Sequence, residues 1–504
     1  MKVKYIVILF LVLGFVACEE DDSAMEEVQV ELTAGSADFS KYVSLGASFT
    51  AGYTDGALFM ASQENSFPNI LSQQFAALGG GEFSQPLMND NIGGLLLGGN
   101  LIQEPRLYFN GSGPVRLDAM PTTEVSNIIA GPYNNMGVPG AKSFHLVANG
   151  YGNVAGVALG LANPYYARMA SSPNASMLED ALAQNPTFFT LSEVGGNDVL
   201  SFATSGGSGV DQTGNLDPST YGPNDITDPN VFASVFSSLV GALTTNGAKG
   251  VVTNVPYVTS LPYFTTVPYN PVPLDVATVT QLNAAYAQYN GGVAQALAYL
   301  VSIGVINQAE ANEELAKRTI NFTEGQNAVV LLDEDLIDLT AVNPALISMR
   351  QATAEDLLVL PSASFIGTLV DNNPLLINGV SVPLEDKWVL TTTESNSVKV
   401  ATDAYNATIE SVASSAGLAL VDLNGILQEA STTGITFDNY TLTTQLVLGG
   451  LVSLDGIHLT ARGYALMANK FLEAIDDTYG SNFIPAGQTA KAGDYPVAYS
   501  PELQ

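Results

Sequence analysis

The stretch YVSLGASFTAG, residues 42–52, decides the fold of this 504-residue chain. Its first part, Tyr42 to Leu45, is a short apolar run that ends at Gly46, which is typical of a buried strand. The glycine-assisted turn that follows presents the hydroxyl of Ser48 at the carboxyl end of that strand. Apolar residues then recur at helical spacing over Phe67 to Phe75. A strand followed by a helix is therefore the first predicted unit.

The same alternation of short apolar runs and helical patterns continues to the end of the chain. The predicted strands are Thr187 to Leu191, Gly250 to Val255 and Leu418 to Leu423, and the predicted helices are Val231 to Leu243, Val276 to Leu300, Val400 to Ala416 and Ala461 to Ile475. Strands that alternate with helices imply parallel strands joined by crossover helices. We therefore predict a three-layer α/β/α domain with a parallel sheet.

Three stretches do not fit a minimal domain of this kind. Residues 79–130, 205–229 and 305–399 are rich in Gly, Pro, Asn or Ser, or carry mixed short patterns, and we interpret them as insertions. A separate domain at 305–399 is the alternative, because that stretch contains apolar runs of its own. The folded domain is expected over residues 41–480, with a C-terminal tail at 481–504.

The N-terminus has the features of an export signal. Two lysines precede an apolar run from Tyr5 to Val16, which is too short to span a bilayer comfortably. The run ends at Cys18, and this arrangement resembles a bacterial lipoprotein signal. That resemblance implies a signal peptide at residues 1–17 and a lipidated Cys18. An uncleaved anchor helix is the alternative.

Residues 18–40 are interpreted as an acidic tether between the lipid and the domain. Their first acidic residues, Glu19 to Asp22, resemble the stretch that follows the lipidated cysteine in surface-exposed lipoproteins of the Bacteroidetes type. The resemblance implies an outer-membrane lipoprotein of the cell envelope, exposed at the surface. A simple solvated tether would have the same composition.

Composition excludes several classes of function. The chain has 16 Lys plus Arg against 49 Asp plus Glu, and a net charge of -33, so its field repels nucleic acid and anionic lipid. A single cysteine excludes an intrachain disulfide and a four-cysteine zinc site. No other stretch is apolar for about 18 uninterrupted residues. Contact with a membrane is therefore expected only through the lipidated N-terminus.

Two distant segments carry the residue types of a serine hydrolase. Ser48 follows the first strand, and ligands of open α/β sheets bind at the carboxyl edge of the strands. Asp455 and His458 lie three residues apart just before the last helix, whose expected N-cap is Thr460. At this spacing a carboxylate can hold Nδ1–H of the imidazole while Nε2 faces the nucleophile.

Four short blocks in order give the chain a specific resemblance. They are Gly46-Ala47-Ser48, Gly140 within residues 135–141, Gly195-Gly196-Asn197-Asp198, and Asp455-x-x-His458. Together they resemble the SGNH hydrolases, also called GDSL esterases and lipases. Ala47 occupies the position where that family usually has Asp.

The resemblance implies a role for each matched residue. Ser48 would attack an ester carbonyl, His458 would act as the base, and Asp455 would orient the imidazole. The backbone N–H groups of Ser48 and Gly140 and the side-chain amide of Asn197 would form the oxyanion hole. The implied substrates are acyl or acetyl esters of lipid or carbohydrate, and no cofactor or metal is implied.

Each block also has a simpler interpretation. Ser48 could end a strand, Asn197 and Asp198 could form an ordinary Asx turn, and Asp455 could support the last helix through its dipole. The alternative functions are an inactive binding lipoprotein on a hydrolase fold and a purely structural surface protein.

The remaining candidate residues are interpreted as structural. His145 has no motif around it. Asp211, Asn215 and Asp217 lack the spacing of a calcium-binding EF-hand loop and are interpreted as turn residues. The glycines at 93–99 have no acidic partner at the spacing of a dinucleotide site. The sequence carries no information on oligomeric state.

Overall fold

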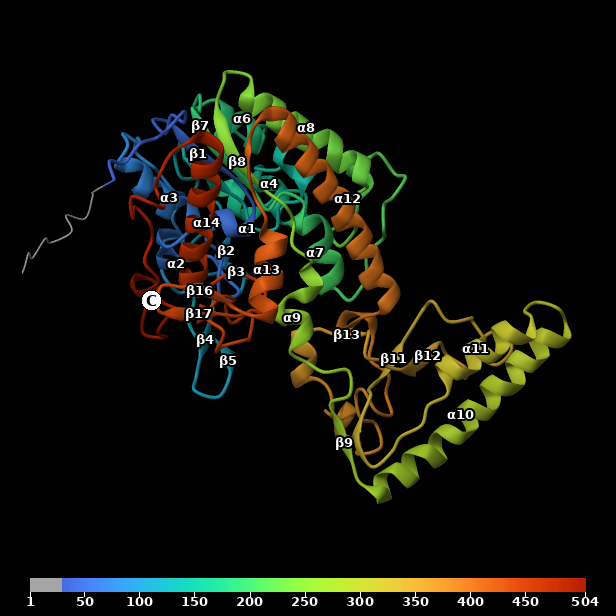
Figure 1. Ribbon diagram of the computed structural model, residues 1–504. Helices are drawn as coiled ribbons and strands as arrows, with labels where there is room; N and C mark the ends of the chain where they lie inside the picture. The colour runs from blue at the N-terminus through green and yellow to red at the C-terminus, as the bar shows by residue number, and fades with distance from the viewer. Residues whose placement is uncertain (1–29) are drawn as a thin grey trace, which may run out of the picture. The chain divides into compact units, whose positions relative to one another are not determined.

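A five-stranded parallel sheet is the centre of the structure. The computed structural model describes residues 30–504, and in them the strand order is β15-β8-β7-β1-β6. Strands β1, β7 and β8 are labelled in Figure 1. The strands are β1 (Tyr42–Gly46), β6 (Asn135–Gly137), β7 (Phe188–Ser192), β8 (Lys249–Thr253) and β15 (Ala419–Val421). Each pairs in parallel with its neighbours. The predicted α/β class with a parallel sheet is confirmed.

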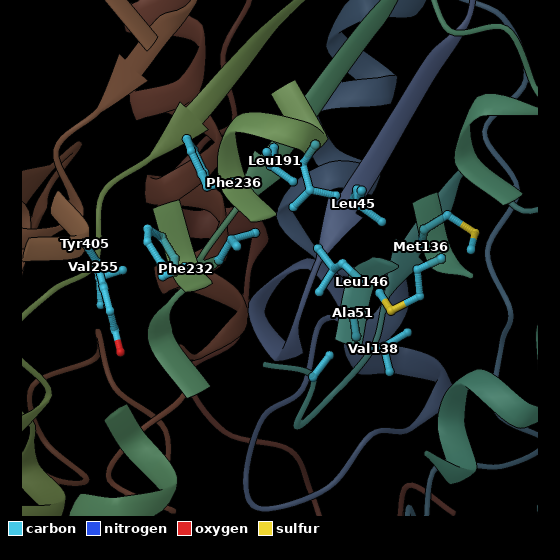
Figure 2. Packing of buried hydrophobic residues seen from close by; sticks show 14 of the residues in the cluster. Leu45, Ala51, Met136, Val138, Leu146, Leu191, Phe232, Phe236, Val255 and Tyr405 are labelled. Carbon is cyan, nitrogen blue, oxygen red and sulfur yellow. The ribbon is translucent and has the colours of Figure 1, made fainter. Parts of the chain in front are cut away.

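Successive residues of each strand face opposite layers, as the period of two in a strand requires. On one face Val43, Leu45 and Leu191 enter a cluster that also holds Phe232 and Tyr405 (Figure 2). On the other face Tyr42, Phe188, Val251, Ala419 and Val421 enter a second cluster. Both faces are apolar because both are covered by helices.

Helices form the two outer layers. Helices α8 (Pro229–Thr244) and α12 (Thr392–Ala416) lie side by side on the first face, together with α6 (Met177–Leu182) and α7 (Gly196–Thr204). Helices α3 (Phe67–Ala76), α13 (Leu423–Thr432) and α14 (Ala461–Tyr479) cover the second face (Figure 1). The arrangement is a three-layer α/β/α fold. Thr460 caps α14 as predicted, because its side chain accepts a hydrogen bond from Gly463 N.

The short helix α1 (Ser48–Ala51) lies very close to the sheet. A Cβ atom on Gly137 would stand 2.2 Å from Ala51 N, and one on Gly46 would stand 2.3 Å from Thr50 Oγ1. Only glycine fits at either position without a shift of the backbone. The two glycines therefore allow the turn that begins at Ser48 to sit directly on the ends of β1 and β6.

Small elements fill the first two predicted insertions and the surrounding loops. Residues 79–130 form two antiparallel hairpins, and residues 205–229 are mostly turns. The hairpin strands are β2 (Leu95–Leu97), β3 (Asn100–Gln103), β4 (Leu107–Phe109) and β5 (Pro114–Arg116). The short helices nearby are α2 (Met60–Glu64), α4 (Val154–Val157), α5 (Pro164–Met169) and α9 (Pro262–Thr265), and a further hairpin is formed by β16 (Ile435–Phe437) and β17 (Tyr440–Leu442).

A third hydrophobic cluster spans residues 267–389 and includes most of the third predicted insertion. The helix expected at Val276 to Leu300 is present as α10 (Val276–Ser302), but its buried side chains enter this cluster. It is therefore not a crossover helix of the sheet, and α12 covers β8 and β15 instead. The other elements here are α11 (Gln308–Arg318), β9 (Val272–Leu274), β10 (Gly325–Asn327), β11 (Val330–Leu332), β12 (Met349–Gln351), β13 (Leu357–Leu358) and β14 (Val389–Leu390).

Both ends of the described chain pack on the second face of the sheet. Ala37 and Phe39, from the segment interpreted as tether, are buried there, and so is Phe483 from the predicted tail. Arg106 is fully buried and donates hydrogen bonds to the carbonyls of Ser500 and Leu503. Leu32–Gln504 form one compact unit.

The signal peptide, Cys18 and the acidic residues 19–22 lie outside the described residues. Within residues 30–504, no helix combines the length and the apolar character needed to cross a bilayer.

Candidate active site

The predicted site residues gather at the carboxyl edge of the sheet, where the strand order changes direction. After β1 the chain goes to β6 on one side, and then to β7, β8 and β15 on the other. Ser48 follows β1, and Asn197 follows β7. In open α/β sheets the crevice at such a switch point binds ligands. The fold therefore brings two of the four sequence blocks to the expected crevice.

The pair Asp455 and His458 lies in the loop before α14. His458 Nδ1 stands 2.8 Å from Asp455 Oδ2, and the two side chains are 12% exposed. The carboxylate is also held by its own loop, because Oδ1 accepts the backbone N–H groups of Ile457 and His458 at 2.9 Å each. Gly56 N, from the segment after α1, donates to Oδ2 at 2.9 Å. The loop is thus joined to the α1 region by the same carboxylate that orients the imidazole.

These contacts keep Asp455 ionised. Burial opposes the charge, but the charge of His458 and the hydrogen bonds outweigh it and hold the pKa of Asp455 well below its ordinary value. An ionised Asp455 accepts the proton on Nδ1 of His458. Nε2 then carries a lone pair, which is the form that a general base requires.

The imidazole packs against the turn that Ser48 begins. The ring of Tyr53 lies 4.6 Å from the ring of His458, and that of Phe49 lies 5.8 Å from it. Tyr53 N donates to Ser48 O at 2.9 Å, which closes the turn. Among the described residues, neither Ser48 Oγ nor His458 Nε2 has a hydrogen-bond partner, and no hydrogen bond joins them. In structures without substrate, catalytic hydrogen bonds are often long or poorly aligned and tighten when the substrate binds.

Each candidate oxyanion donor group has an N–H without an acceptor among the described residues. Gly140 adopts φ +80 in an exposed loop, and its N–H has no acceptor among the described residues. The same is true of Ser48 N–H. Asn197 Nδ2 donates one hydrogen to Ala141 O at 2.9 Å, and an amide nitrogen carries a second. Ser48 N, Gly140 N and Asn197 Nδ2 therefore each keep one hydrogen that can be donated to a ligand.

The loop that carries Gly140 is tied down from two directions. Asp198 accepts hydrogen bonds from Ser143 N at 2.8 Å and Ser143 Oγ at 2.6 Å, across 55 residues of sequence. Asn163 Nδ2 donates to Pro139 O at 2.8 Å. Asp198 thus makes long-range contacts, unlike a residue of a local Asx turn. It fixes the loop of Gly140 beside the helix that carries Asn197.

Glu193 is a functional candidate that the sequence analysis missed. It lies directly after β7, it is 7% exposed, and its Oε1 accepts Ala47 N at 2.7 Å and Thr50 N at 3.0 Å. Burial raises its pKa to about 7, against the opposing effect of these hydrogen bonds. The available signal was an acidic residue immediately after a buried apolar strand.

The other candidates have structural contacts. His145 stacks on Tyr151 with ring centroids 4.2 Å apart, and its Nδ1 accepts Lys142 N at 3.1 Å. Burial and the charge of Lys142 lower the pKa of His145 to about 3, so it is neutral. Asp211, Asn215 and Asp217 each accept a backbone N–H two residues ahead, as turn residues do. Within residues 30–504, no cluster of three or more His, Cys, Asp or Glu could hold a metal ion.

An apolar cavity lies beside the site, and a polar cavity lies at the ends of β8 and β15. One has a volume of about 50 Å³ and is almost wholly apolar; its walls include Phe49, Leu423, Leu427, Ile457, Leu466 and Met467. The other has a volume of about 380 Å³ and is mainly polar; its walls include Asn254, Tyr257, Asp403, Asn406, Glu410 and Asp422. The apolar cavity is bounded by the residue after Ser48 and the residue before His458.

No protein-family model matches this chain, and no curated protein or solved structure matches it either.

Proposed function

We propose that this protein is a serine ester hydrolase of the SGNH type. The observation that carries the proposal is the Asp455–His458 pair, joined at 2.8 Å and packed against the turn that begins at Ser48. Ligands of open α/β sheets bind at a topological switch point, which is where Ser48 lies. Ser48, Gly140 and Asn197 each have an N–H without an acceptor in residues 30–504, and N–H groups of this kind stabilise an oxyanion. A nucleophile, an oriented base and oxyanion donors are the parts that acyl transfer needs.

In the proposed reaction, Ser48 Oγ attacks the ester carbonyl carbon as His458 Nε2 removes the hydroxyl proton. The carbonyl oxygen gains the negative charge and accepts hydrogen bonds from the oxyanion donors. Collapse of the tetrahedral intermediate breaks the ester C–O bond, and the alcohol leaves with the proton from His458. Water then attacks the acyl-enzyme by the same route, which releases the acid and restores Ser48.

A fluorophosphonate probe and p-nitrophenyl acetate test this function on purified residues 30–504. Wild type should be labelled and should release p-nitrophenol, and Ser48→Ala should do neither. Ser112→Ala, in an exposed hairpin turn, is the matched control and should behave as wild type. Equal labelling of wild type and Ser48→Ala would refute the assignment of Ser48, and a lack of labelling and turnover in both would favour an inactive binding protein.

The apolar cavity supports a substrate class for this reaction. A water needs about 10–15 Å³ of such space, so about 50 Å³ holds roughly three or four heavy atoms of an aliphatic chain. We propose an ester whose short aliphatic group enters this cavity. Ile426 also lines the cavity, so Ile426→Trp should fill it and lower activity on butyrate esters more than on acetate esters. Exposed Leu448→Trp should leave the ratio unchanged.

The site of action is proposed to be the cell envelope, through a lipid on Cys18. Growth of the expressing bacterium with an alkyne fatty acid should label the wild-type chain and leave Cys18→Ser unlabelled. Label on both chains would contradict the anchor without affecting the hydrolase assignment.

A further inference from the structure

The nucleophile turn lacks a cap of its own. Ala47 is the N-cap of α1 and has no side chain able to accept a hydrogen bond. Glu193 supplies that acceptor from the end of β7: Oε1 accepts Ala47 N at 2.7 Å and Thr50 N at 3.0 Å, and Oε2 accepts Thr50 Oγ1 at 3.2 Å. The carboxylate of Glu193, at the end of the neighbouring strand, therefore binds the backbone on both sides of Ser48.

This capping is selective among the N–H groups of the turn. Glu193 occupies those of Ala47 and Thr50, and Ala51 N donates to Ala47 O at 3.1 Å. The N–H groups of Ser48 and Phe49 lie between them and have no acceptor among the described residues. A carboxylate at this position thus fixes the turn and leaves the Ser48 N–H available for the oxyanion.

The surroundings of Glu193 are unfavourable for a purely structural residue. Its φ is +48, a left-handed conformation that non-glycine residues rarely adopt. Its neighbours are hydroxyl and amide groups: Thr253 Oγ1 accepts its N–H at 2.8 Å, and Tyr464 of α14 is the nearby titratable side chain. No Lys or Arg in residues 30–504 bonds to the carboxylate. Strain and an unpaired buried charge together point to a functional role.

We propose that Glu193 is a positioning residue, whose carboxylate holds the Ser48 turn in its reactive conformation and replaces the support that Ala47 does not provide. The proposal rests on the proposed hydrolase function. Burial raises the pKa of Glu193 to about 7, so the support weakens when the carboxylate gains a proton near neutral pH. The ionisable groups that contact this segment from the loop before α14 are Asp455, through Gly56, and His458, through Phe49.

Glu193→Gln tests the charge while keeping an oxygen that can accept both N–H groups. Charge-assisted hydrogen bonds are about twice as strong as neutral ones, and the loss should lower kcat about tenfold above pH 8. At low pH Glu193 of the wild type is protonated and, like the Gln of the variant, carries no charge. The ratio of wild-type kcat to variant kcat should therefore rise with pH, with a midpoint near 7.

The matched control is Glu394→Gln. Glu394 is another buried carboxylate that accepts backbone and side-chain hydrogen bonds at a helix start, from Thr391, but it lies at α12. The ratio of wild-type kcat to Glu394→Gln kcat should stay near one at every pH.

The variant Glu193→Ala removes the acceptor altogether. It should lose more activity than Glu193→Gln, with KM little changed.

A pH-independent ratio near one for Glu193→Gln overturns the proposal, even where Glu193→Ala fails to fold. A wild type without Ser48-dependent turnover overturns the hydrolase function itself, and the positioning role with it.

Discussion

Removal of the buried charge of Glu193 should make the protein more stable at alkaline pH, in the same variant that loses activity. Burial raises the pKa of this carboxyl from 4.5 to about 7, so the folded state binds its proton more tightly than the unfolded state. Between these two pH values the folded chain holds more protons, and its free energy of unfolding falls as the pH rises. Above pH 7 the full penalty of the charge is present.

The size of the effect follows from the two pKa values. The difference is about 2.5 units, and each unit corresponds to about 1.4 kcal/mol, which gives about 3 kcal/mol. Glu193→Gln should match wild type near pH 4.5 and exceed its free energy of unfolding by up to about 3 kcal/mol at pH 8.

Urea unfolding of both proteins at pH 4.5, 6 and 8, followed by intrinsic fluorescence, measures this difference. Burial also raises the pKa of Glu394, so Glu394→Gln should gain stability over the same pH range without a loss of activity. Both variants should gain stability because each removes a buried charge, but only Glu193→Gln should lose activity. The comparison therefore separates the cost of burying a charge from the role of the charge in catalysis. A difference between Glu193→Gln and wild type that does not change with pH would refute the reasoning.

Three further variants test other contacts. Asn197→Ala removes one oxyanion donor and should lower kcat by about 10²–10³-fold with little change in KM, measured with p-nitrophenyl acetate; a loss below threefold would exclude Asn197 from the oxyanion hole. Asp455→Asn keeps the shape of the loop but favours the wrong imidazole tautomer, so kcat should fall by about 10⁴-fold while circular dichroism is unchanged; retained activity would exclude the pair from catalysis. Arg350→Met leaves the buried carboxylates of Asp333 and Asp356 without their partner and should destabilise the 267–389 cluster by about 3–5 kcal/mol, seen as faster hydrogen exchange there; unchanged exchange would show that the ion pairs are dispensable.

Much of the sheet could be predicted because its strands are buried on both faces. In Phe188–Ser192, for example, the adjacent residues Phe188 and Phe189 are both large and apolar although they face opposite layers, and such a pair is visible in sequence. Strand β6 was missed because Asn135–Gly137 has only one large apolar residue. The helix over 276–300 was predicted correctly, yet periodicity cannot identify the surface on which a helix packs, and its partner proved to be the third cluster.

The resemblance to a family named Ser48, Gly140 and Asn197, but a contact within the site could be derived from spacing only where its residues are close in sequence. Asp455 and His458 are three residues apart, so their contact follows from local geometry. The contact of Glu193 with Ala47 crosses 146 residues and depends on the pairing of β1 with β7, which no local pattern encodes. The same holds for Asp198 and Ser143.

The buried guanidinium of Arg106, between β3 and β4, binds residues 500–503 to the hairpins of residues 79–130. Its donors meet the carbonyls of Asn91, Ser500 and Leu503, and no carboxylate hydrogen-bonds to it among the described residues. Backbone carbonyls are an acceptor set that side-chain substitution cannot remove, so this contact tolerates sequence change at positions 500–503 but not their deletion. For protein engineering, an affinity tag appended after Gln504 preserves it, whereas trimming the chain at Tyr499 would strand a buried cation.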